Sequence, residues 1–204
     1  FSPRVYPDDS TADTYVVQRG DSLSTIPRQA GFNIDYRLVQ RINQISDPRR
    51  LGMGQRIKGL YGPFHAVVHK SAFRLDVYTD QRDSAGNRIY IRSFPVGLGE
   101  YGSTPIGSWV VAEGKVLNPG WRNPRTGEVF DKDDPLNPIG ERWIGLEGTD
   151  ENTALESGYG IHGTVEPESI GREMSMGCVR MLADDVALMF ELLVPGRSTV
   201  EIVP

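Results

Sequence analysis

Residues 161–181 read IHGTVEPESIGREMSMGCVRM and contain the only cysteine of the 204-residue chain. Cys178 stands between small and polar residues and not within an apolar run. Gly177 allows a tight backbone turn there and leaves amide N–H groups free to face a reacting carbonyl oxygen. A thiol becomes a good nucleophile as the thiolate, and His162 can supply the imidazole that takes its proton. The stretch therefore predicts a nucleophilic cysteine presented on a tight turn.

Three short motifs follow one another in this stretch: His-Gly-Thr at 162–164, Ser-Ile-Gly at 169–171 and Ser-Met-Gly-Cys-Val-Arg-Met at 175–181. Taken singly, Cys178 could be a small buried hydrophobe and His162 a core histidine. Together the motifs resemble the active-site signature of the L,D-transpeptidases, the YkuD-type catalytic domain, and favour catalysis. Many members of that family have histidine two residues before the cysteine. Met176 stands at this position, so the second imidazole of the pattern is missing.

The resemblance implies a role for each residue next to the thiol. Cys178 would attack the substrate and become a thioester. His162 would act as general base, with the Gly163 carbonyl oxygen holding its other ring nitrogen. The backbone N–H groups of Met176, Gly177 and Cys178 would stabilise the oxyanion.

Two polar residues of the same motif are predicted to lie at the substrate. Arg180 could meet a substrate carboxylate, and a structural ion pair is the alternative. Ser175 is expected to form hydrogen bonds within the loop.

The resemblance also implies a reaction, with no metal or organic cofactor. An exported enzyme of the bacterial cell wall would take a tetrapeptide stem as acyl donor, attack the bond after its third, L-centred residue and release the terminal D-alanine. An amine on a neighbouring stem would then accept the acyl group and form a 3→3 cross-link. Water as acceptor would make the same site an L,D-carboxypeptidase. A glycan-binding wall protein with an inactive second domain is the remaining alternative, and Met176 is the argument for it.

A separate pattern occupies residues 14–61. It predicts a strand at 14–17, a first helix that Pro27 makes short or kinked, a second helix capped by Asp35, and a last strand that includes Ile57. The segments YVVQRGDSLSTI, LVQRIN and LGMGQRI resemble a LysM module, which binds glycans containing N-acetylglucosamine. The resemblance implies a shallow groove at the turn after Asn43 and near Gly20, Asp21, Ser22 and Leu23. The alternative is that these residues only cap helices and fill a small core.

From Phe64 the sequence alternates as strands require, and residues 83–87 read as the tip of a hairpin. His65 and His69 on one extended strand would stand about 13 Å apart, too far to share a metal ion, so we expect them on the surface or on a strand face. Near the C-terminus, Asp184 is predicted to cap a helix, and residues 199–203 a closing strand.

Residues 113–152 are long, polar and interrupted by four prolines. So long an irregular segment is uncommon in a compact domain unless it forms a lid or a substrate wall. We expect a cleft wall that carries Trp121 and Trp143, with core packing of either ring as the alternative.

Composition limits the classes of function. The 23 glycines and 14 prolines favour strands and loops over helices. The net charge is −5, but residues 14–61 carry eight positive and three negative charges, against thirteen and twenty-one in residues 62–204. The basic residues are dispersed without interleaved aromatic residues, which argues against nucleic-acid binding. No apolar run has the roughly 18 residues of a membrane-spanning helix.

The predicted organisation is a leader or linker at 1–13, a small α+β LysM module at 14–61 and a predominantly β, sandwich-like catalytic domain with a short helix at 62–204. The expected partners are peptidoglycan stem peptides and glycan. Since the chain begins with Phe1 and not Met, we expect that an export or anchor segment has been removed. The expected location is the bacterial cell wall, periplasm or spore or cell envelope.

Overall fold

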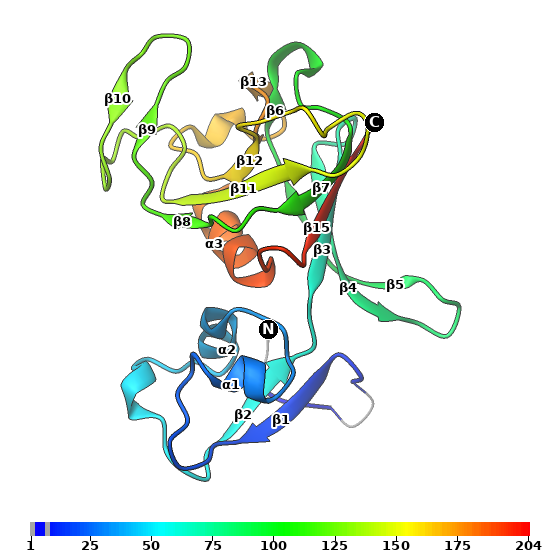
Figure 1. The fold of residues 1–204 in the computed structure, drawn as a ribbon, viewed down its shortest axis with the longest axis vertical. Coiled ribbons are helices and arrows are strands. Elements are labelled where there is room, and N and C mark those ends of the chain that lie inside the picture. The colour runs from blue at the N-terminus through cyan, green and yellow to red at the C-terminus, as the bar shows by residue number, and fades with distance from the viewer. Residues whose placement is uncertain (1–2, 7–8) are drawn as a thin grey trace.

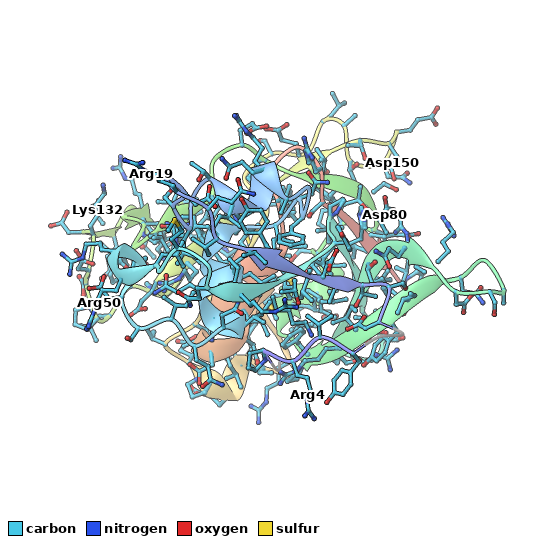
Figure 2. All side chains as sticks on the ribbon, turned by 90° about the horizontal axis from the view of Figure 1, so that it is seen from below. Arg4, Arg19, Arg50, Asp80, Lys132 and Asp150 are labelled. Carbon is cyan, nitrogen blue, oxygen red and sulfur yellow. The ribbon has the colours of Figure 1, made fainter. Side chains whose placement is uncertain are left out.

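The computed structural model describes residues 3–6 and 9–204. Figure 1 shows a small body built from the first part of the chain, coloured blue to cyan, below a larger body coloured green to red. Charged side chains such as those of Arg19, Arg50 and Lys132 lie at the periphery (Figure 2).

The small body has the predicted order of strand, helix, helix, strand. Its elements are β1 (Ala12–Val16), α1 (Ile26–Gln29), α2 (Tyr36–Ile42), the 3₁₀ helix η1 (Pro48–Arg50) and β2 (Arg56–Leu60), with β1 antiparallel to β2. The first helix is short and not kinked, which was one of the two predicted outcomes. Pro27 lies in its first turn, where a missing N–H is tolerated. Asp35 caps α2 as predicted, since its carboxylate accepts from the Arg37 N–H at 2.9 Å.

The core of this body requires one close approach. The ring of Phe32 lies on Gly59 of β2, where a Cβ atom would come within 2.0 Å of the ring. Leu38, Ile42 and Ile57 belong to the same core and are fully buried.

The small body begins before residue 14, so the end of the predicted leader at residue 13 already belongs to it. β1 begins at Ala12, and Lys58 Nζ donates to the Arg4 carbonyl oxygen at 2.9 Å. Residues 1–2 and 7–8 of that segment lie outside the described residues.

The large body is a curled sheet that packs on one helix of ten residues. Among the described residues, nine strands form this sheet in the order β14-β12-β11-β7-β15-β3-β4-β5, with β8 paired to β11. Their bounds are β3 (Phe64–His69), β4 (Arg74–Arg82), β5 (Arg88–Pro95), β7 (Gly107–Val111), β8 (Val116–Leu117), β11 (Arg142–Gly148), β12 (Gly160–His162), β14 (Val179–Arg180) and β15 (Thr199–Val203). The β4–β5 hairpin has its tip at 83–87, and β15 closes the sheet between β7 and β3, both as predicted.

Short elements frame the end of the sheet where the motif lies. They are β6 (Leu98–Gly99), η2 (Glu100–Gly102), β9 (Trp121–Arg122), β10 (Val129–Phe130), η3 (Pro167–Ser169) and β13 (Glu173–Ser175). The segment at 113–152 that was predicted as irregular is less irregular than expected, because β8 and β11 of the main sheet lie within it. It also contains a small hairpin, β9 with β10, which projects from the large body in Figure 1.

The helix α3 (Ala183–Leu192) begins earlier than predicted. Leu182 has extended geometry and is the N-cap residue, so the expected cap at Asp184 is wrong. Asp184 lies in the first turn together with Asp185, where negative charge is favoured by the helix dipole.

The two histidines of β3 have partners within the sheet. His65 is buried, not at the surface, and its Nδ1 lies 2.8 Å from Thr199 Oγ1. His69 Nε2 lies 3.2 Å from an Asp76 carboxylate oxygen. Within residues 3–6 and 9–204, no group of three or more His, Cys, Asp and Glu side chains could hold a metal ion, and no helix is both long and apolar enough to cross a membrane.

The two bodies are joined by helix packing and ion pairs. Helices α2 and α3 face each other across the junction (Figure 1). Arg41 on α2 binds Glu191 on α3 with two hydrogen bonds of 2.5 and 2.8 Å. Arg197 also donates to the Asn33 side-chain oxygen at 2.6 Å. The junction is therefore a specific interface and not a loose tether.

Candidate active site

Cys178 lies in the turn that connects β13 to β14. Gly177 in this turn has φ of 127°, a conformation that favours glycine. A Cβ atom on Gly177 would stand 2.6 Å from the Tyr159 ring and 3.2 Å from the Ser103 carbonyl oxygen. The glycine before the cysteine is thus required by both backbone conformation and packing.

A cavity of about 320 Å³ opens next to this turn. It brings together residues that are far apart in the sequence, including seven of the predicted site residues: Trp121, Trp143, His162, Ser175, Met176, Cys178 and Arg180. The other two predicted residues of this group, Gly163 and Gly177, are outside this lining, and Gly163 lines a second cavity.

His162 ends strand β12 and is held there in one orientation. β12 runs parallel to β14, which places His162 opposite Arg180 in the sheet. The imidazole is only 4% exposed, and its Nδ1 lies 2.6 Å from the Gly163 carbonyl oxygen. Because a carbonyl oxygen only accepts, Nδ1 carries the proton and the lone pair is on Nε2. The Trp143 ring stacks on the imidazole at 5.8 Å with an angle of 18°.

The thiol has a different partner from the one expected. Cys178 Sγ donates to the Gly158 carbonyl oxygen at 3.7 Å, and within the described part of the chain it forms no hydrogen bond with His162. Both side chains nevertheless line the same cavity. His162 is the last residue of β12, and Cys178 directly precedes the adjacent parallel strand β14. In unliganded sites such catalytic contacts are often long and tighten when substrate binds.

Burial keeps both groups neutral. It raises the pKa of the Cys178 thiol to about 11 and lowers the pKa of His162 to about 4. The nearby Arg180 charge and the Gly160 backbone oppose the shift of the thiol but do not cancel it. At neutral pH the resting site therefore holds a thiol and a neutral imidazole, not an ion pair.

The backbone of the turn is organised by Ser175. Its hydroxyl donates to the Cys178 carbonyl oxygen at 2.6 Å and accepts from the Gly177 N–H at 3.1 Å. The Cys178 N–H has no hydrogen-bond acceptor among the residues that the structure describes. Of these amides, that of Cys178 is free to face an oxyanion, and that of Gly177 is already bonded.

Arg180 forms an ion pair within the protein, which was predicted as the alternative to a contact with a substrate carboxylate. One guanidinium nitrogen lies 2.9 Å from a Glu166 carboxylate oxygen. The guanidinium Nε is buried without a partner in the part of the chain described. The residue also lines the cavity, so the ion pair and a contact with substrate are compatible.

The two predicted tryptophans contribute to the wall in different ways. Trp143 stacks on His162, whereas Trp121 stacks on Phe130 of the β9–β10 hairpin at 5.9 Å. Three further lining residues, Pro124, Pro138 and Ile139, belong to the segment that was predicted as a cleft wall. Sequence reasoning missed the other three: Ser157, Gly158 and Tyr159. Tyr159 could have been found, because an aromatic residue between two glycines stands just before His162.

The loop predicted to meet glycan uses much of its polarity internally. Asp21 accepts from the Tyr15 hydroxyl at 2.9 Å and from the Gln18 N–H at 2.7 Å. Ser22 bonds Ser24 at 2.9 Å. Leu23 is 2% exposed, so its side chain belongs to the core and is not available to a sugar.

Comparison with known sequences identifies both parts of the chain. The family model described as the L,D-transpeptidase catalytic domain matches residues 63–202. The chain belongs to this family. The LysM domain model matches residues 15–58 of the same L,D-transpeptidase chain. The predicted fold class, a LysM module followed by a mainly β L,D-transpeptidase domain, is confirmed.

The L,D-transpeptidase family also includes relatives that match most of the chain. The putative L,D-transpeptidase YkuD of Bacillus subtilis is 29% identical over 93% of this chain and 98% of its own length. The putative L,D-transpeptidase YqjB of the same organism is 39% identical, but over 46% of this chain, which spans about half (48%) of that relative. The probable L,D-transpeptidase ErfK/SrfK of Escherichia coli is 27% identical over 97% of this chain and 61% of its own length.

Solved structures support the L,D-transpeptidase fold. An L,D-transpeptidase from Mycobacterium smegmatis superposes with a TM-score of 0.50 at 16% identity, over 74% of this chain and 64% of that chain. One from Mycobacterium tuberculosis H37Rv gives 0.50 at 13% identity, over 76% of this chain and 75% of that chain. At such low identity these likenesses concern the fold alone.

Proposed function

We propose that this L,D-transpeptidase forms 3→3 cross-links in peptidoglycan through a thioester on Cys178, and that its LysM module anchors it to glycan. The observation that carries the proposal is the orientation of His162. Its Nδ1 is fixed on the Gly163 carbonyl oxygen, which leaves Nε2 as the basic atom in the cavity that also contains Cys178.

The first half-reaction is acylation. Nε2 of His162 takes the thiol proton as Sγ attacks the carbonyl carbon after the third stem residue. The free Cys178 N–H stabilises the oxyanion, and the Gly177 N–H can join it if it releases the Ser175 hydroxyl. Collapse of the tetrahedral intermediate breaks the amide bond, and the imidazolium gives its proton to the leaving amine of D-alanine.

Because both groups are neutral at rest, proton transfer accompanies attack and does not precede it. An imidazole whose pKa is about 4 would not hold the thiol proton before the oxyanion charge develops. Such general-base assistance contributes ~10²–10⁴-fold to the rate. Met176 has no titratable side chain, so His162 is the only base that the motif supplies.

The second half-reaction releases the enzyme. An amine of a neighbouring stem attacks the thioester carbon, His162 Nε2 takes a proton from this amine, and the thiol is restored. Arg180 would orient a stem carboxylate, and its lining of the cavity with an Nε that has no partner in the described residues supports this role. Trp121 and Trp143 form the apolar wall against which the stem would lie.

The proposed partners and location follow from the two domains. The LysM module would hold the enzyme on glycan containing N-acetylglucosamine, and the substrate is found in the bacterial cell wall. The enzyme would therefore act outside the cytoplasm, in the wall, the periplasm or the spore or cell envelope, with residues 14–61 as the anchor and residues 62–204 as the catalyst.

Incubation with a purified disaccharide-tetrapeptide, followed by mass analysis, tests this function. A cross-linked dimer together with free D-alanine is the expected result, and Cys178→Ala is the matched control that should leave the substrate unchanged. Tripeptide without dimer would make the protein an L,D-carboxypeptidase. Unchanged substrate with the native chain would contradict the proposal and favour a glycan-binding protein with an inactive second domain.

A further inference from the structure

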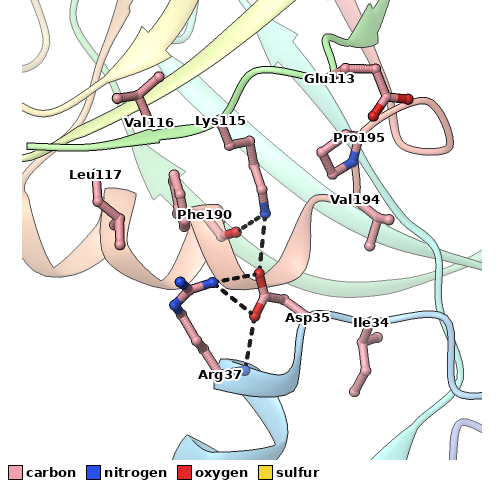
Figure 3. A pocket seen from close by; sticks show the side chains of 10 residues that line it. All are labelled: Ile34, Asp35, Arg37, Glu113, Lys115, Val116, Leu117, Phe190, Val194 and Pro195. Carbon is pink, nitrogen blue, oxygen red and sulfur yellow. Dashed lines mark hydrogen bonds and ion pairs between the residues drawn. The ribbon is translucent and has the colours of Figure 1, made fainter. Parts of the chain in front are cut away.

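Two open hollows lie side by side at the junction of the two domains. One, of about 490 Å³, is bordered by Asp35 and Arg37 of the LysM module and by Val116 and Leu117 of the catalytic domain (Figure 3). The other, of about 470 Å³, follows the surface of α2 as far as Gln44, Ile45 and Ser46. Arg37 lines both hollows, and we call the two together the junction groove.

The two ends of the junction groove lie near the expected glycan site and near the Cys178 cavity. One end is the turn after Asn43, which was predicted to border the glycan site of the LysM module. The other end is strand β8, which pairs with β11 through Val116 and Trp143. Trp143 forms part of the wall of the Cys178 cavity. The groove thus extends from the expected glycan site to within one strand of the active site.

The lining of the groove fits a polysaccharide. Tyr36 is half-buried next to the groove, and the Arg37 guanidinium lies 4.8 Å from the centre of its ring. Gln44 adds an exposed amide group, whereas the Gln40 side-chain nitrogen already donates to the Ile45 carbonyl oxygen at 3.0 Å. At the far end Val116 and Leu117 are 38% and 41% exposed. An N-acetylated sugar presents apolar C–H faces next to polar hydroxyl and amide edges, and this combination matches aromatic and aliphatic surfaces with amide and guanidinium donors.

The groove is also rigid, because a buried lysine fixes the two domains beneath it. Lys115 Nζ donates to the Phe190 carbonyl oxygen and lies 3.6 Å from an Asp35 carboxylate oxygen (Figure 3). It also donates to the Leu193 carbonyl oxygen at 2.8 Å. Asp35 in turn pairs with Arg37 at 3.2 Å. The Lys115 donors are thereby occupied within the protein, so this residue supports the groove and is not a ligand contact. A preformed groove avoids the entropy cost of ordering the two domains on binding.

We propose that the junction groove binds an extended strand of β-linked N-acetylated amino sugars, so that residues of the catalytic domain share in glycan recognition. The inference rests on the proposed function, because it assumes that the LysM module binds such a glycan. Leu117 and Val116 would extend the binding site beyond the module. A bound strand would then run toward the cavity that holds Cys178, with its length set by the fixed junction.

Calorimetric titration of the full chain with a hexamer of N-acetylglucosamine tests the groove. Leu117→Asp should weaken binding ~5-fold or more, because it puts a charge on an apolar contact surface, and Leu117→Ser should weaken it less. Arg37→Ala should also weaken it. Arg49→Ala is the matched control, since Arg49 lies on the same module, is highly exposed and does not line either hollow. Thermal unfolding of each variant checks that it is folded.

Two outcomes separate this inference from the proposed function. If both Leu117 variants are folded and bind the hexamer as tightly as the native chain, glycan binding is confined to the LysM module and the inference is overturned. The native chain should also form a single covalent adduct with a carbapenem. Absence of that adduct would contradict the proposed catalysis, whereas reduced binding by the Leu117 variants would still support the groove.

Discussion

The loop at residues 20–23 of the LysM module, which was predicted to meet glycan, differs from the cavity of the catalytic domain in how far its polar groups are already bonded. In the loop, the Asp21 carboxylate is already engaged by the Tyr15 hydroxyl and the Gln18 N–H. In the cavity, His162 Nε2 and the Cys178 N–H have no hydrogen-bond partner among the described residues. Both groups are therefore available to a new partner, whereas the Asp21 carboxylate already accepts from two donors.

This difference shows what separates a surface that binds from a site that reacts. A binding loop can satisfy its polar groups and still present its edges to a ligand. A catalytic site needs a basic atom and a hydrogen-bond donor that have no partner in the resting protein and bind the transition state. Variants of the chain can test this contrast, beginning with those expected to have the largest effect.

Removal of the nucleophile should abolish covalent chemistry. A carbapenem contains a strained amide that resembles the scissile carbonyl, and its leaving group stays tethered, so it should acylate Cys178 once. Intact-mass analysis should show one adduct on the native chain and none on Cys178→Ala. An adduct on the variant would place the nucleophile elsewhere.

Removal of the base should slow acylation without abolishing it. His162→Ala should lower the rate of thioester formation by at least ~10²-fold, the lower end for loss of a general base. Met176→Ala is the matched comparison, and it should be much milder because it keeps the backbone N–H and removes only a flexible apolar side chain. Stopped-flow fluorescence with a carbapenem measures both rates. Equal losses in the two variants would mean that His162 has been misassigned.

The stability of the junction between the two domains should decrease when the Arg41–Glu191 ion pair is lost. Arg41→Ala removes the partner of the Glu191 carboxylate, which is 12% exposed. The free energy of unfolding should fall by about 1–2 kcal/mol. This loss is smaller than for a fully buried pair because the Arg41 side chain is 45% exposed. Arg49→Ala, which breaks a pair at the surface, should change stability by less than about 0.5 kcal/mol. Thermal unfolding compares them, and equal melting temperatures would show that the junction pair contributes nothing.

The smallest expected effect is a displacement of the pH profile. Burial lowers the pKa of His162 to about 4, so its neutral form persists well below pH 6.5. An ordinary histidine would be about 97% protonated at pH 5. The rate of acylation by a carbapenem at pH 5 should therefore stay close to its value at pH 7 and fall only nearer to pH 4. A loss centred near pH 6.5 would show that the imidazole is not held neutral by its surroundings.

The sequence predicted the elements that depend on local signals. Asp35 caps α2, and Pro27 limits α1 to the residues around it, because capping and proline effects act within one turn. Asp184 misled the prediction of α3, since Leu182 supplied the extended N-cap geometry and the carboxylate was favoured inside the first turn instead.

Long-range features could not be predicted in the same way. The motif indicated which residues surround the thiol, but not that Cys178 Sγ would face the Gly158 carbonyl oxygen. The bond of Arg41 to Glu191 joins positions that are 150 residues apart, and no local pattern in either segment specifies the other. The burial that sets the pKa values of His162 and Cys178 likewise depends on the folded chain.

The stacking of Trp143 on His162 makes the active site visible to spectroscopy. The two rings are nearly parallel and 5.8 Å apart, so a change of charge or position of the imidazole occurs against the face of an indole. A protonated imidazole would interact with that face as a cation with a π system and alter its emission. The protein therefore contains an optical reporter of its own histidine, with no label attached, and replacement of Trp143 by phenylalanine would isolate its signal from those of Trp109 and Trp121.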